Sequence, residues 1–252
     1  MSRTIQSAIL SVIGAVTLTA CFTGVFTNFV KPSLRWYLVA AALVLLAMGA
    51  YGVLTARAHA DQVEAQAAHD EPEDHSGHGH DHSRGPLVGW FLLVPFLLLG
   101  FIVPPPLGSF AAQRDSGQVR GADKSFVDTP SDLPEGKITE MALDEYSMRA
   151  LYDESESLAD RSVRLIGFAS PDSQAEGGWA LTRMKLSCCA ADAYSIKINP
   201  VGSRPVPENT WVAVTGVWEK TPGDPNAEDF QLPRIKVSSI EQIPQPENPY
   251  ES

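Results

Sequence analysis

Two adjacent cysteines, Cys188 and Cys189, are followed after a short interval by a carboxylate, Asp192. Thiolates bind soft and borderline metal ions, and a nearby carboxylate can add a further ligand. Neighbouring side chains of an extended strand point to opposite faces, so both thiols can contact one ion only on a turn. Ser187 and the Ala190–Ala191 pair permit such a turn. A vicinal disulfide, or one buried structural cysteine beside one exposed cysteine, remains open as an alternative.

The histidines form a second candidate metal-binding region. All six lie between His59 and His82, in a stretch rich in Asp and Glu that also contains glycines. Imidazole is the commonest protein ligand for transition metals, but such a tract indicates weak capture at several positions rather than one fixed geometry. The alternative is a solvated loop without a ligand. The candidate metal ligands are His69, His75, His78, His80 and His82, together with Cys188, Cys189 and Asp192.

The charge and the motifs of the chain exclude several classes of function. The formal net charge is −11, and the part from Pro104 onward carries 23 acidic and 14 basic residues. Because nucleic acid binds to basic surfaces, this balance argues against nucleic acid as a partner. The sequence has no phosphate-binding loop, Gly-x-Ser-x-Gly elbow or HExxH motif. The part of the chain from Pro104 onward, which contains Cys188 and Cys189, has no histidine, so a Cys-His catalytic pair within it is excluded. We expect a protein that is not an enzyme.

Three apolar segments predict membrane-spanning helices, since about 20 apolar residues cross a bilayer. They run from about Ile5 to Val30, from Trp36 to Leu54 and from Leu87 to Val103. Pro95 lies inside the third segment, and the prolines at 104–106 end it, because proline cannot continue a helix. We expect two helices in residues 1–56, the histidine-rich loop in 57–86 and the third helix in 87–103, in a multi-pass protein of a cell membrane.

The processing and the orientation of the membrane part remain open. Leu18-Thr19-Ala20-Cys21 fits a lipoprotein cleavage box, whereas the apolar residues after Cys21 favour a small buried cysteine on a helix. With three spans, the histidine-rich loop and the C-terminal domain lie on opposite sides of the membrane. Five basic residues against three near the span ends favour a cytoplasmic C-terminal domain, and lipoprotein processing would reverse this orientation.

The rest of the chain predicts a soluble β-rich domain over 136–246, after a Pro-, Gly-, Ser- and Asp-rich linker over 104–135 and before a tail over 247–252. Asp144 is the expected N-cap of a helix over 144–157. Short strands with glycines at 167 and 216 resemble a small oligonucleotide/oligosaccharide-binding (OB) barrel. The expected fold class is an α-helical membrane region followed by this mainly-β domain. The expected strands are Ile138–Leu143, Val163–Phe168, Trp179–Lys185, Tyr194–Ile198, Trp211–Trp218 and Arg234–Ile240.

Several features occur together along nearly the whole chain. They are Phe29-Val-Lys-Pro32 between spans, the histidines at 75–82, Pro95 with the prolines at 104–106, the CCAAD element at 188–192, and the WVAVTG and PENPY segments. In this combination the chain resembles the YcgQ-like family of bacterial permease subunits, and the CCxxD element is the most specific part. Lys31 stands where the family usually has a histidine, so no metal role is carried over to that position.

The resemblance implies an accessory subunit that works beside a larger permease, with a link to zinc-responsive genes. We therefore expect a role in the transport or homeostasis of zinc or another divalent metal, with zinc as the bound ion. Two alternatives stay open. One is a thiol-redox protein of the cell envelope, in which the adjacent cysteines cycle between dithiol and disulfide. The other is a scaffold, in which the β-rich domain recruits another protein.

Overall fold

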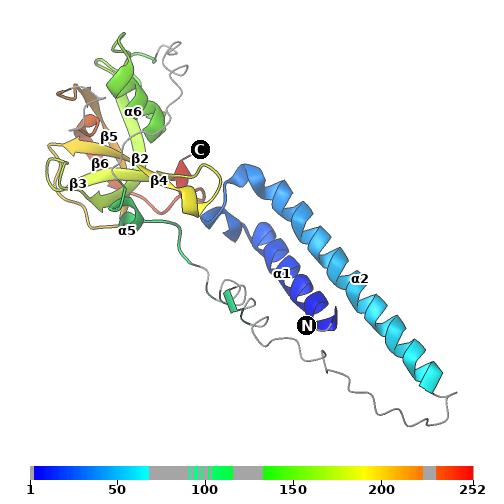
Figure 1. The fold of residues 1–252 in the computed structure, drawn as a ribbon. Helices are drawn as coiled ribbons and strands as arrows, with labels where there is room; N and C mark the ends of the chain where they lie inside the picture. Colours follow the sequence, from blue (N-terminus) through cyan, green and yellow to red (C-terminus); the bar gives the residue numbers. More distant parts are fainter. Residues whose placement is uncertain are drawn as a thin grey trace. The chain divides into compact units, whose positions relative to one another are not determined.

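The structure is a computed structural model that describes residues 3–67, 91, 94–95, 98, 102, 104–115, 133–223 and 231–251. The chain divides into two compact units, Met1–Pro105 and Pro106–Ser252 (Figure 1). Most of the expected third span lies outside the described residues. The same holds for the candidate ligands of the histidine-rich loop, which are His69, His75, His78, His80 and His82.

The first unit contains two long apolar helices, α1 and α2. By length and composition each can cross a membrane, over Ile5–Thr23 and Pro32–Ala56, although a signal sequence or a buried helix passes the same test. Helix α1 ends before Gly24, whose φ of 78° suits glycine because it has no Cβ. Helix α2 includes residues 57–67, which the sequence placed in the loop. The elements are α1 (Arg3–Thr23), η1 (Val25–Asn28), η2 (Pro32–Leu34) and α2 (Arg35–Ala67).

Small residues line the contact between α1 and α2. A Cβ added at Gly14 would lie 2.9 Å from the carbonyl oxygen of Ala42, and one at Gly49 would lie 2.3 Å from Oγ of Ser11. Small residues allow this close approach of two backbones, as they do between helices in lipid. Cys21 is buried on α1, as expected for a small side chain on a packed helix.

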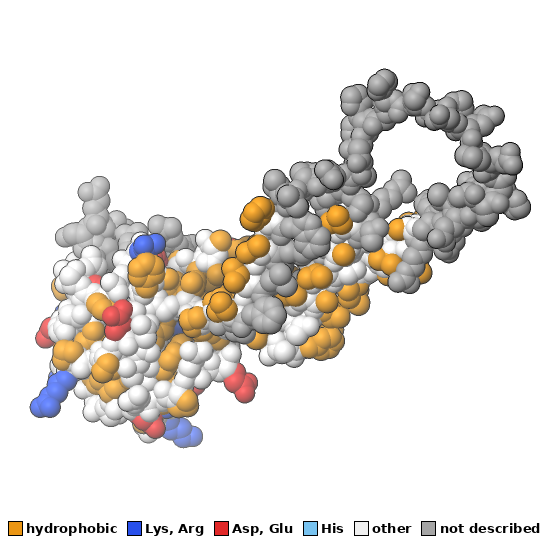
Figure 2. Space-filling view, turned by 90° about the horizontal axis from the view of Figure 1, so that it is seen from below, with side chains coloured by type: hydrophobic (Ala, Val, Ile, Leu, Met, Phe, Trp, Pro, Cys, Tyr) orange, Lys and Arg blue, Asp and Glu red, His pale blue; other side chains and the backbone are white. Residues whose placement is uncertain are grey.

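Large apolar side chains lie on the outside of these two helices. Figure 2 shows hydrophobic side chains over much of the visible surface of the described helical residues. A water-soluble unit would bury this surface, so its exposure agrees with an apolar surrounding. The exposed large apolar residues of α1 and α2 are Phe22, Trp36, Tyr37, Leu43, Val44, Met48, Tyr51 and Leu54.

The second unit is built on a mixed seven-stranded sheet with the order β1-β2-β5-β6-β4-β3-β7. Strand β2 also pairs with β3, so β2, β5, β6, β4 and β3 form a closed ring of pairings. Within this ring only β4 and β6 are parallel neighbours. The elements are α5 (Ser109–Ala112), β1 (Thr139–Met141), α6 (Leu143–Tyr152), β2 (Ser162–Pro171), β3 (Trp179–Lys185), η4 (Ala190–Asp192), β4 (Tyr194–Val201), β5 (Trp211–Glu219), β6 (Arg234–Gln242) and β7 (Tyr250–Glu251).

The six predicted strands are confirmed, with ends that differ by a few residues. The predicted N-cap of the helix is wrong, because α6 begins at Leu143 after Ala142, one residue earlier than Asp144, and ends at Tyr152. Two further elements lie where the sequence predicted none. Helix α5 falls in the expected linker, and β7 falls in the expected tail, where Tyr250 and Glu251 are buried.

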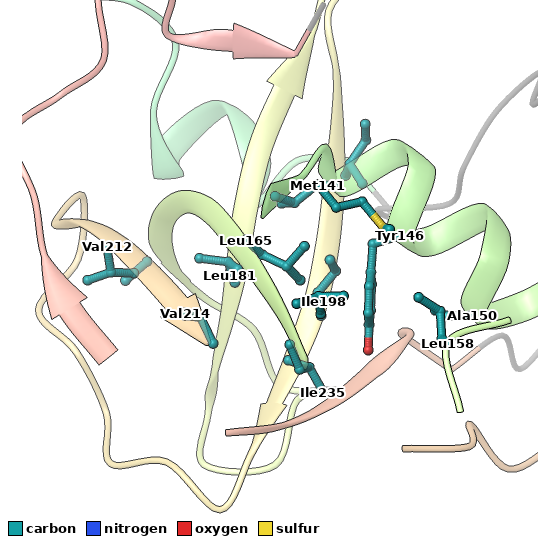
Figure 3. Packing of buried hydrophobic residues seen from close by; sticks show 14 of the residues in the cluster. Met141, Tyr146, Ala150, Leu158, Leu165, Leu181, Ile198, Val212, Val214 and Ile235 are labelled. Carbon is teal, nitrogen blue, oxygen red and sulfur yellow. The ribbon is translucent and has the colours of Figure 1, made fainter. Parts of the chain in front are cut away.

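The core of this unit lies between the strands and α6 (Figure 3). Leu165, Leu181 and Ile198 are fully buried, and Tyr146 of α6 packs with them while its hydroxyl donates to the carbonyl oxygen of Arg234 at 2.6 Å. Gly216 allows a close approach of β5 and β6. A Cβ at this position would lie 2.3 Å from the carbonyl oxygen of Lys236, and the pairing of β5 with β6 shifts register there.

Candidate metal centre

The two adjacent cysteines lie in the loop that joins the antiparallel neighbours β3 and β4. The last pair of the ladder is Lys185 with Tyr194, so residues 186–193 form a hairpin loop, called here the cysteine loop. Leu186 at its start is buried in a small apolar cluster with residues of β2, β3 and β7. The loop therefore begins at a fixed point and then turns out towards solvent, where Ser187 and Cys188 are exposed.

Asp192 organises this loop through backbone hydrogen bonds. Its Oδ1 accepts the N–H groups of Ser187, Cys188 and Cys189 at 3.0, 3.2 and 3.2 Å, and its Oδ2 accepts that of Cys188 at 2.9 Å. Cys189 is the N-cap of the short η4 turn, and its sulfur accepts the N–H of Asp192 in return. One carboxylate thus holds three successive backbone N–H groups together, a concave arrangement that favours negative charge.

This turn brings the two thiols and the carboxylate together. One ligand atom from each of Cys188, Cys189 and Asp192 lies within 4.8 Å of the other two. All three cysteines of the protein are free thiols, with Cys188 exposed, Cys189 half-buried and Cys21 buried in the other unit. The turn that the sequence requires for both thiols to contact one ion is therefore present, with Cys189 at the start of η4.

The electrostatics of the cysteine loop keep Cys188 protonated. Hydrogen bonding of its thiol to Asp192 and then to Cys189 raises the pKa of Cys188 to about 11. The same hydrogen bond from Cys188, with the backbone N–H groups of residues 187–189, lowers the pKa of Asp192. A thiol of this kind is a weak nucleophile, because the thiolate is the reactive form. A bound cation reverses this effect, since its charge stabilises both thiolates beside the carboxylate.

Residues 128–251 match the family model of the DUF1980 C-terminal domain. This match covers the cysteine loop and is consistent with the YcgQ-like resemblance, while the helices of the first unit and the histidine-rich loop lie outside it. No curated protein and no solved structure matches the chain. The description of the family names no activity, so the function has to be argued from the site itself.

The DUF1980 C-terminal domain also contains charged residues near the cysteine loop that the sequence did not single out. Lys185, the last residue of β3, forms an ion pair with Asp144 of α6. Arg183 on the same strand contacts Glu251 of β7 at 3.3 Å between Nε and Oε2. The sequence carries almost no signal for these pairs, because they join positions that are 41 and 68 residues apart. A two-residue strand such as β7 also has no periodicity to detect.

Proposed function

We propose that this protein is an accessory subunit of a membrane permease that handles zinc or another divalent metal ion. The observation that carries the proposal is the grouping of two thiols and a carboxylate within 4.8 Å on the cysteine loop. Two sulfur ligands favour zinc over magnesium or calcium, which prefer oxygen ligands. The ion would be held by Cys188 and Cys189, with Asp192 adding an oxygen ligand or orienting the loop.

The exposure of the site suits exchange of the ion more than permanent storage. Structural zinc sites are closed by four protein ligands, whereas this group offers three. Because Cys188 is exposed, a donor or acceptor molecule can reach this side of the site and supply a further ligand. This arrangement fits a subunit that passes metal to or from a larger permease.

The membrane part of the proposal has three spans, and the histidines at 69–82, which follow the end of α2 at Ala67, gather ions by weak contacts. Support comes from the length and apolar composition of α1 and α2, and from the large apolar side chains that they expose. We place the protein in a bacterial cell membrane as a multi-pass protein. The histidine-rich loop and the cysteine loop would then lie on opposite sides.

The domain that carries the cysteine loop is, in this proposal, an OB-like barrel. The order of pairings supports it, because β2, β3 and β4 form consecutive antiparallel neighbours, β4 pairs with β6 in parallel, and β5 joins β6 back to β2. The close approach of strands at Gly167 and Gly216 also suits a strongly bent sheet. This connectivity places the cysteine loop between the second and third strands of the ring.

A thiol-redox function is the second candidate, because both cysteines are free and adjacent. The raised pKa of the Cys188 thiol makes this residue a weak attacking group in disulfide exchange, which needs a thiolate. A scaffold role does not require the two thiols of the cysteine loop. Metal binding uses both thiols, and Asp192 either adds an oxygen ligand or holds the loop in place.

Elemental analysis of the full chain, purified in detergent, tests the proposal. We expect about one zinc per chain in the wild type and none retained in the Cys188→Ser/Cys189→Ser double variant. Cys21→Ser is the matched control, because it removes a thiol from the other unit and should keep the metal. A wild type without metal, even after reduction and incubation with Zn²⁺, would contradict the proposal. Loss of two titratable thiols on oxidation of that metal-free protein would instead favour the redox function.

A further inference from the structure

The end of strand β3, from which the cysteine loop begins, is held on both edges by different strands. On one edge it pairs with β4 as far as Lys185. On the other edge it pairs with β2 only between Trp179 and Thr182, and β7 takes over at Met184 and Lys185. Strand β7 therefore completes the sheet immediately before the cysteine loop.

Strand β7 is fixed in place by Glu251, whose side chain is 2 % exposed. Its Oε1 accepts the N–H of Leu143, the first residue of α6, at 2.7 Å. The N-cap residue of this helix, Ala142, makes no side-chain hydrogen bond to the first turn. Glu251 thus supplies, from 108 positions away, the acceptor that the local sequence lacks.

Arg183 holds the same segment from the side of β3. Its Nη2 donates to the carbonyl oxygens of Asn248 and Tyr250 at 2.7 and 3.2 Å, and its Nε lies 3.3 Å from Oε2 of Glu251. Arg183 lies only four residues before Ser187, whose N–H donates to Asp192. A change in the position of β7 would therefore reach the cysteine loop through the last residues of β3.

We propose that Glu251 and Arg183 are positioning residues for the thiol pair, because they hold β7 along the end of β3 and so fix the start of the cysteine loop. This role rests on the metal site proposed above. When β7 is released, the last residues of β3 lose one of their two neighbours, and the loop must be ordered again each time an ion binds. Ordering a loop upon binding lowers the affinity.

The test uses Co²⁺ as the probe, with the full chain in detergent and under reducing conditions. Thiolate ligands give cobalt a charge-transfer absorption that reports on sulfur coordination. We expect Glu251→Ala to weaken Co²⁺ binding by about tenfold, the lower end of the loss caused by removing a group that holds a metal ligand, because Glu251 acts on the loop only through β3. Glu251→Gln keeps an oxygen acceptor for the N–H of Leu143 and should restore most of the affinity. Glu241→Ala, in an exposed ion pair with Arg164, is the matched control and should bind as the wild type does.

Hydrogen exchange of the metal-free proteins provides a second readout. Glu251→Ala should accelerate exchange of the backbone amides of residues 187–189, while the amides in the centre of β5 stay protected. If Glu251→Ala binds Co²⁺ with wild-type affinity and leaves these amides unchanged, the positioning role is wrong while the metal site stands. If the wild type gives no thiolate–cobalt absorption, the metal site itself fails. Should Glu251→Ala not fold, Glu251→Gln is compared with Glu241→Ala instead. The role would be overturned if Glu251→Gln bound Co²⁺ poorly while the amides of its residues 187–189 exchanged as in the wild type.

Discussion

The two units of this protein place their apolar side chains in opposite ways. In the helical unit small residues such as Gly14 and Ala42 lie in the contact, and large side chains such as Leu43 and Trp36 are exposed. In the sheet unit large side chains such as Leu165 are fully buried. In water the hydrophobic effect favours burial of large apolar side chains, as in the sheet unit. In an apolar solvent their exposure, as in the helical unit, costs no such free energy. The contrast is the one expected if the helical unit lies in lipid, as proposed, and the sheet unit in water.

The largest expected effect is the difference in stability between two leucine substitutions, one in each unit. Leu165→Ala should destabilise the sheet unit by about 2–5 kcal/mol, because it leaves a cavity in a closely packed core. Leu43→Ala, on the exposed face of α2, should change the free energy of unfolding in detergent by less than about 1 kcal/mol. Chemical unfolding followed by tryptophan fluorescence measures both. Equal losses for the two variants would mean that the outer face of α2 is packed against protein.

The contact between the helices predicts the next effect. Gly14→Leu should cost about 1–3 kcal/mol, because even its Cβ would lie 2.9 Å from the carbonyl oxygen of Ala42. Gly24→Ala is the comparison for strain without a clash. A Cβ at Gly24 would meet no atom within 4 Å, but the φ of 78° at this residue is unfavourable for alanine. Crosslinking between cysteines introduced on α1 and α2 would show whether the helices separate. Unchanged crosslinking in Gly14→Leu would contradict the close packing.

Glu251 of the sheet unit predicts a dependence of stability on pH. Burial of the side chain, opposed by Arg183 and aided by Asp144, raises the pKa of Glu251 from 4.5 to about 7. The folded state therefore binds this proton more tightly than the unfolded chain does. The stabilisation is fully present below about pH 4.5 and is lost as the pH rises to about 7, by at most about 1.4 kcal/mol per pH unit.

Unfolding of the full chain between pH 5 and pH 8 measures this loss, with Glu251→Gln as the control. The variant has no carboxyl group to titrate, so its profile should be flatter over this interval. Asp153 does not interfere, because its pKa is lowered to about 2 by hydrogen bonds from Ser155 and Ser157 that outweigh its partial burial. A wild-type stability that rises between pH 5 and pH 7 would show that the pKa of Glu251 is not raised.

The smallest effect is expected at the surface of the sheet unit. Arg164 forms ion pairs with Glu140 and Glu241 at 2.9 and 3.2 Å, and both carboxylates are mostly exposed. Exposed pairs contribute about 0–1 kcal/mol and are screened by salt. Arg164→Ala should therefore change the free energy of unfolding by less than about 1 kcal/mol, and the difference should shrink in 1 M salt. A larger loss would mean that the aliphatic part of Arg164 packs on the sheet.

Local patterns predicted much of the sheet unit, and distant contacts explain where prediction was wrong. The strands were found because β-branched and aromatic residues alternate between turn residues. Asp144 was chosen as an N-cap because it has the right side chain, yet it forms an ion pair with Lys185 and lies inside α6. The cap comes from Glu251, which no local pattern could indicate.

Some features of the cysteine loop follow from the sequence alone, and others depend on the tertiary structure. The residue types alone determined that thiols and a carboxylate occur together and that the apolar segments of α1 and α2 suit a membrane, because these are properties of side chains. The hydrogen bonds of Asp192 are local, because they join residues three to five positions apart. Tertiary structure decided that Glu251 of β7 caps α6 and that β7 supports the start of the loop. Hydrogen bonds and strand pairs of this kind depend on which segments meet in space, and a linear pattern does not contain that information.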